Sequence, residues 1–174
     1  MGAVLQWRNG FLAALAPLLW LCSLGVGEAL AGRGEETVIH GKVTGINKDH
    51  SLVVQEGGKT YVFHFYGIVF PKEARGISKG SRVFLEEATF GKRVRVRPIS
   101  AGRSKRRYAL IFLDGLNLNE EMVRRGMAWV VPRGCILSEC DSLIKAQEEA
   151  KASSKGVWAG KGVSPPWERG SRKK

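Results

Sequence analysis

The chain has 174 residues, with 28 lysines and arginines against 16 aspartates and glutamates, which gives a formal net charge of +12 at pH 7. This length, with a hydrophobic content of 44%, indicates one globular domain with its own core and excludes a miniature domain that depends on cross-links. A positive field of this size attracts polyanions such as nucleic acid, anionic lipid or acidic polysaccharide, or it serves solubility alone.

The N-terminal segment has the pattern of a cleavable signal peptide. Arg8 precedes an apolar run from Phe11 to Val26, and the small residues Ala29 and Ala31 follow at the −3 and −1 positions of a cleavage site. The run of 16 residues contains Pro17 and falls short of the roughly 20 that span a bilayer. We therefore expect residues 1–31 to be removed after Ala31, without stable membrane insertion afterwards. The mature protein is expected to be secreted or periplasmic.

The elements that follow predict a mainly β protein. Alternating and β-branched residues predict strands over residues 37–46, 51–55, 59–66, 92–98 and 108–113. Helical periodicity predicts helices over residues 81–90, 117–125 and 141–155, whereas residues 67–79, with Pro71 and Gly76, are predicted as a loop. Over residues 32–160 this order predicts an α+β domain, a five-stranded OB-like barrel with one helix after the third strand and C-terminal helices. Residues 161–174 are predicted to be a basic and mostly disordered tail.

Two cysteines, Cys135 and Cys140, remain in the expected mature chain. In an oxidising compartment an even number of cysteines favours a disulfide, here one that closes a short loop before the last long helix. A metal site would need further ligands, and the three histidines of the chain lie far upstream.

A basic strand and a basic loop form the candidate ligand surface. Between residues 92 and 98 the valines alternate with arginines, so the arginines are expected to share the outer face. The candidate nucleic-acid-binding residues are Arg93, Arg95, Arg97, Lys105 and Arg107. Tyr61, Tyr66 and Tyr108 are candidate platforms on which bases could stack.

Several segments together resemble the staphylococcal-nuclease-like (thermonuclease-like) family. They follow the pattern of that family in order and spacing: Asp114-Gly115, Asn117-Leu-Asn119, residues 122–126, Ala128-Trp129 and residues 156–158. The resemblance implies an OB-like barrel with a groove that, in active members, cleaves DNA or RNA phosphodiesters with calcium. It also implies a site in which two aspartates hold the calcium, a glutamate activates water and two arginines neutralise the phosphate.

Two of these five groups have counterparts in this sequence. Asp49 lies in the turn that carries the first calcium aspartate, and Arg106 matches the second arginine. Asp49 is therefore the candidate metal ligand and Arg106 a candidate catalytic residue. The alternative interpretation of Asp49 is an ordinary turn aspartate, and that of Arg106 is one more solvated charge in a basic loop.

The other three groups are replaced. The family stretch Arg-Leu-x-Gly-Ile-Asp-x-Pro-Glu corresponds to residues 64–72, where His64 replaces the arginine, Val69 the aspartate and Lys72 the glutamate. Glu73, one residue further along, is a second candidate for the glutamate. Because calcium takes six to eight oxygen ligands, the loss of a carboxylate and the arrival of a lysine should disfavour it.

The sequence thus favours a nucleic-acid or polyanion-binding module that lacks calcium-dependent phosphodiesterase chemistry. The protein is expected to be a monomer. No cofactor is expected in that case, and calcium is expected only if the protein is active. The first alternative is an active endonuclease in which His64 acts as general acid or base. The second is a structural domain that binds protein or an envelope polymer.

Overall fold

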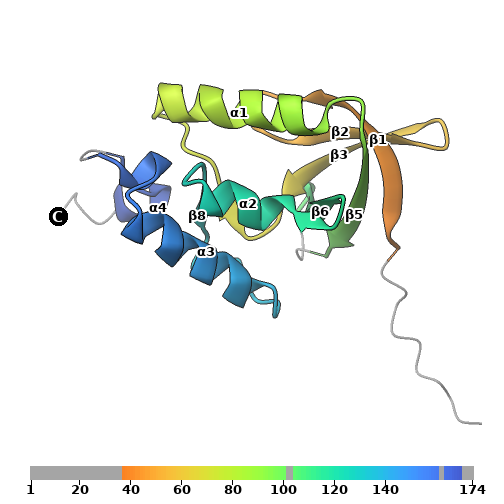
Figure 1. Ribbon diagram of the computed structural model, residues 1–174. Coiled ribbons are helices and arrows are strands. Elements are labelled where there is room, and N and C mark those ends of the chain that lie inside the picture. The colour runs from red at the N-terminus through yellow and green to blue at the C-terminus, as the bar shows by residue number, and fades with distance from the viewer. Residues whose placement is uncertain (1–36, 101–103, 161–162, 170–174) are drawn as a thin grey trace, which may run out of the picture. The chain divides into compact units, whose positions relative to one another are not determined.

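The computed structural model describes residues 37–100, 104–160 and 163–169 (Figure 1). The predicted signal peptide, residues 1–31, lies outside the described residues. Within the described segments, no helix is both long enough and apolar enough to cross a membrane.

Five strands form a closed barrel of mixed pairing, which confirms the predicted fold class. The first three strands are an antiparallel meander, the fourth barrel strand pairs with the first, and the fifth pairs with the fourth. The last barrel strand then pairs in parallel with the third and closes the barrel. These strands are β1 (Ile39–Ile46), β2 (Leu52–Glu56), β3 (Lys59–Phe65), β5 (Arg93–Ile99) and β6 (Arg107–Leu113). Three two-residue strands complete the set: β4 (Ile68–Val69), β7 (Leu116–Asn117) and β8 (Trp129–Val130).

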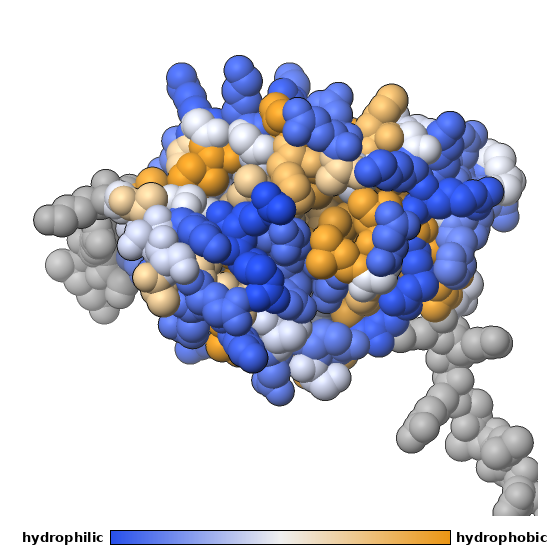
Figure 2. Space-filling view, viewed as in Figure 1, coloured by the Kyte–Doolittle hydropathy of each residue, from blue (hydrophilic) through white to orange (hydrophobic). Residues whose placement is uncertain are grey.

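Helices cover the barrel on the sides where its apolar residues would otherwise be exposed. In Figure 1, α1 runs along the top of the view, and α2 and α3 pack against each other below it. Figure 2, from the same side, shows hydrophilic side chains projecting along α1. The helices are α1 (Arg75–Thr89), α2 (Leu118–Arg124), α3 (Cys140–Ala152), a 3-10 turn (Gly156–Trp158) and α4 (Pro166–Arg169).

The structure corrects two sequence-based element assignments, in α1 and in the predicted loop before it. Helix α1 begins at Arg75, whereas the prediction placed its start at residue 81. Its first turns lack an apolar stripe because their polar side chains face outward, so hydrophobic periodicity cannot mark them. Strand β4 lies in the predicted loop, and its two residues are too few to show alternation. Within the tail predicted to be mostly disordered, Pro166–Arg169 forms a short helix.

The core fills the barrel with the inward-facing residues of each strand. Val43, Leu52, Val54 and Phe63 are buried, as is Leu85 of α1. On β5 the predicted alternation is confirmed, because Val94 and Val96 are buried whereas the arginines lie on the other face.

Asn119 joins the elements that meet where the barrel closes. Its side chain is completely buried, and its Nδ2 donates to the carbonyl oxygens of Tyr66 (2.9 Å) and Ala109 (3.1 Å). Its Oδ1 accepts the backbone N–H of Ile111 at 3.0 Å. One side chain from α2 therefore satisfies backbone groups of β6 and of the residue that follows β3.

The predicted disulfide between Cys135 and Cys140 is present, with an S–S distance of 2.09 Å. The loop that it closes packs against the turn after β3. Gly67 in that turn has a φ of +75°, and a Cβ there would lie 2.6 Å from the sulfur of Cys135. The hydroxyl of Tyr66 accepts the backbone N–H of Ile136 at 3.0 Å. Only glycine fits between the turn and the disulfide loop.

We predict that Asn119→Ala lowers the free energy of unfolding by about 3 kcal/mol, because it leaves buried backbone groups without partners. Asn117→Ala is the matched control in the same segment. Asn117 caps α2 by accepting from the N–H groups of Asn119 and Glu120, and loss of such a cap costs about 1 kcal/mol. Urea denaturation measures both changes, and equal losses in the two variants would contradict the role given to Asn119.

Candidate functional site

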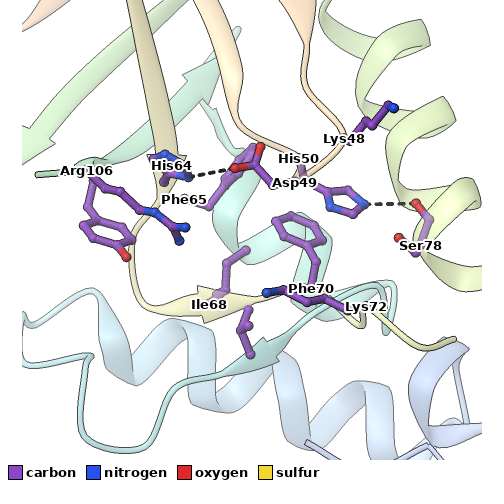
Figure 3. Close-up of a pocket in the computed structure, with 12 residues that line it drawn as sticks. Lys48, Asp49, His50, His64, Phe65, Ile68, Phe70, Lys72, Ser78 and Arg106 are labelled. Atoms are coloured by element: carbon purple, nitrogen blue, oxygen red, sulfur yellow. Dashed lines mark hydrogen bonds and ion pairs between the residues drawn. The ribbon is translucent and has the colours of Figure 1, made fainter. Parts of the chain in front are cut away.

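A cleft of about 400 Å³ lies beside the point where β3 and β6 close the barrel. The turn after β1, the end of β3, the β4 segment, α1 and the start of β6 all contribute to it (Figure 3). The lining side chains that are charged or can form hydrogen bonds are Lys48, Asp49, His50, His64, Lys72, Ser78, Arg106 and Tyr108.

The parallel pairing of β3 with β6 sets the basic and aromatic wall of the cleft. It places His64 opposite Tyr108, with their ring centroids 5.8 Å apart. Arg106 directly precedes β6 and therefore reaches the same wall. Figure 3 shows the guanidinium of Arg106 and the amine of Lys72 reaching into the cleft from either side.

Asp49 is held by its own turn and faces His64. Its Oδ1 accepts the hydroxyl of Ser51 at 2.7 Å and the backbone N–H of Ser51 at 3.2 Å. Its Oδ2 lies 3.8 Å from Nδ1 of His64 (Figure 3). Partial burial alone would raise the pKa of Asp49, but the Ser51 hydrogen bonds and the nearby His64 together lower it. Asp49 is therefore a carboxylate at neutral pH.

Three effects set the protonation of His64. Burial lowers its pKa most, Asp49 raises it, and the positive charge of Arg106 lowers it again, so the pKa lies below the ordinary histidine value. The imidazole is therefore mainly neutral at pH 7 and can accept a proton. The sequence alone offered no partner for His64, and the structure supplies Asp49.

His50 has a structural role next to this pair. Its ring stacks on Phe70 with centroids 4.1 Å apart, and its Nε2 lies 2.9 Å from the carbonyl oxygen of Ser78. Because a carbonyl only accepts, Nε2 carries the hydrogen. Burial lowers the pKa of His50. The bond ties the turn after β1 to α1 and so sets the width of the cleft.

The donor set of the cleft does not fit calcium. Val69 and Lys72 both line it, and Asp49 is the one carboxylate among the lining residues. Glu73 is exposed and does not line the cleft, so it does not replace the missing glutamate there. Over the described part of the chain, no group of three or more histidine, cysteine, aspartate or glutamate side chains could hold a metal ion. Calcium needs six to eight oxygens, and neighbouring lysines repel it.

The arginines of the β5 face lie together as predicted, but they do not line the cleft. Each has a partner within the protein. Arg93 donates to the carbonyl oxygen of His40 at 3.3 Å, and the guanidinium of Arg95 lies 4.0 Å from the ring centre of Phe112. Arg97 forms an ion pair with Glu139. Ligand binding by this face stays a prediction.

The basic loop lies beside two of the three tyrosines, Tyr61 and Tyr108, in a hollow next to the cleft. Arg107 lies over the ring of Tyr61 at 5.4 Å, and both line a hollow of about 370 Å³ that shares Arg106 and Tyr108 with the cleft. Lys105 is exposed next to them. Tyr66 is only 5% exposed, so its proposed role as a stacking platform is wrong.

The sequence patterns did not identify Lys48 as a cleft residue, since an isolated turn lysine has no distinguishing pattern.

The comparisons with known proteins agree with this fold. The family model described as "Staphylococcal nuclease homologue" matches residues 65–160, so the chain belongs to the staphylococcal nuclease family. An "Uncharacterized endonuclease" of Escherichia coli O157:H7 is 27% identical over 131 residues, 74% of this chain and 83% of that protein. A second "Uncharacterized endonuclease", from Haemophilus influenzae, is 28% identical over 123 residues, 70% of this chain and 67% of the relative. A "Probable staphylococcal-like nuclease" of Oryza sativa subsp. japonica is 28% identical over 110 residues, 63% of this chain and 32% of that protein.

The charges of Asp49 and Arg106 lead to opposite predictions for the pKa of His64 when each is removed. Asp49→Asn removes the charge that stabilises the imidazolium, so the pKa of His64 should fall further. Arg106→Gln removes the charge that opposes it, so the pKa should rise. Titration of the His64 ring resonances by NMR measures both shifts, with the exposed His40 as an internal control. Shifts of the same sign in both variants would contradict the arrangement.

Proposed function

We propose that this nuclease-family domain binds nucleic acid in the cleft and lacks calcium-dependent phosphodiester hydrolysis. The observation that carries the proposal is the charge of the cleft: one carboxylate, Asp49, stands among Lys48, Lys72 and Arg106. Such a wall attracts phosphate, whereas the family's metal requires carboxylates. Tyr61 and Tyr108 in the adjoining hollow offer ring faces for base stacking.

A second candidate function is phosphodiester cleavage without a metal, and the 3.8 Å approach of Asp49 to His64 favours it. Neutral His64 would accept a proton from the attacking water, and Asp49 would stabilise the imidazolium. The water oxygen would bond to phosphorus while the bond to the leaving oxygen breaks. That oxygen would take a proton from bulk water, and Arg106 would neutralise the charge that develops on the phosphate.

We also propose that the mature protein acts outside the cytoplasm, secreted or in a periplasm. The signal-peptide pattern that ends at Ala31 supports this location. The disulfide between Cys135 and Cys140 agrees with it, because disulfides persist in oxidising compartments.

Calcium binding tests the main proposal. We expect no calcium binding by the wild-type protein in calorimetric titration, because Val69 and Lys72 occupy the carboxylate positions. Val69→Asp with Lys72→Glu should restore measurable binding together with Asp49. Val69→Asn with Lys72→Gln is the matched control, since it changes the same positions without adding carboxylates. Calcium-dependent cleavage by the wild-type protein would overturn the proposal.

Binding and cleavage of labelled single-stranded DNA and RNA, with a chelator present, separate the remaining possibilities. Arg106→Gln should weaken binding at all sequences and reduce the salt slope of log affinity by about 0.7, the value for one lost single-strand phosphate contact. If the β5 face is the ligand surface instead, substitution of Arg93, Arg95 and Arg97 will abolish binding and Arg106→Gln will not. Cleavage that survives chelator and is lost in His64→Gln establishes the second candidate. Absence of binding by all variants and by the wild type favours the structural role.

A further inference from the structure

A second basic hollow adjoins the cleft, and we infer that it holds the phosphates of a nucleic-acid strand as the strand leaves the cleft. The hollow measures about 350 Å³ and is lined by Lys48, Lys72, Arg75, Ser78, Lys79 and Arg82. The inference rests on the proposed function and adds the path and the length of the ligand.

Three parts of the chain build this basic hollow: helix α1, the turn after β1, and the segment before α1 that carries Lys72. Arg75, Lys79 and Arg82 lie four and three residues apart on α1, so they share one face of the helix. Lys48 comes from the turn after β1, and Figure 3 shows it extending toward α1. The bond between His50 and the carbonyl of Ser78 holds that turn against the helix. This hydrogen bond therefore holds Lys48 next to the cations of α1.

Among the described residues, the cations of the basic hollow have no carboxylate partner. All the lining residues of the hollow except Ser78 are cations. Three arginines elsewhere in the fold are paired: Arg97 with Glu139, Arg124 with Glu120, and Arg125 with Glu121. Like charges held in one hollow repel one another, and bound phosphates relieve that repulsion.

The two cavities adjoin each other and share part of their lining. Lys48, Lys72 and Ser78 line both the cleft and the basic hollow. A ligand with one phosphate near Arg106 can therefore place further phosphates against α1 without leaving a basic surface. A linear polyanion with regularly spaced phosphates matches this shape, and a single strand of nucleic acid has that chemistry. The β5 arginines play no part in this path.

The test compares labelled deoxythymidine oligomers of about 3 and about 12 nucleotides, which lie below and within the usual site sizes of OB-fold proteins. Arg75→Gln, Lys79→Gln and Arg82→Gln are combined in one variant, which leaves the cleft residues unchanged. Each lost single-strand phosphate contact reduces the salt slope of log affinity by about 0.7, so the longer oligomer should lose about 2. The short oligomer should bind as it does to the wild type. Fluorescence anisotropy over a salt series measures both.

A variant with Lys59, Lys145 and Lys155 changed to glutamine is the matched control, because it removes the same charge from exposed sites elsewhere. Circular dichroism checks that both variants keep their helices. Equal salt slopes in the two variants, or equal weakening of short and long oligomers, would overturn the inference. Failure of the proposed function is distinct: the short oligomer would then not bind the wild type, and Arg106→Gln would change nothing.

Discussion

The parallel pairing of β3 with β6 is the interaction on which the barrel and its cleft depend. Within the described residues it is the only parallel strand pair, and it converts an open antiparallel sheet into a closed barrel. Asn119 satisfies the backbone groups at this junction, where water is excluded. The same pairing places His64 beside Tyr108 and Arg106, so one set of backbone contacts determines both the fold and the basic wall of the cleft.

The electrostatics of the cleft support the proposal that this nuclease-family domain binds phosphate without a calcium site. By the family resemblance, Val69 stands where a calcium-binding aspartate is expected and Lys72 where the water-activating glutamate is expected, and both residues line the cleft. Asp49 remains, but its neighbours are cations and His64 rather than further oxygen ligands. A site of this composition favours an anion over a divalent cation, because each lysine adds attraction for the first and repulsion for the second.

Periodicity predicted the barrel strands, because five of them are long enough to alternate between core and surface. It did not predict the two-residue β4 or the first turns of α1, where Arg75 and Lys79 replace an apolar stripe. Those turns lack the stripe because their exposed side chains face the basic hollow instead of the core. The first turns of α1 were thus missed because the site rather than hydrophobic burial shapes them, whereas β4 was missed because it has only two residues.

The sequence by itself determined the family resemblance, the fold class and the disulfide between Cys135 and Cys140. Through that resemblance it also predicted that Val69 and Lys72 stand where carboxylates are expected. These follow from local order, spacing and residue type, which a linear sequence preserves. Only the tertiary structure decided that Asp49 faces His64, that the β5 arginines bond within the protein, and that α1 contributes cations next to the cleft. The physical reason is that these contacts join residues far apart in the chain, and barrel closure rather than local periodicity brings them together.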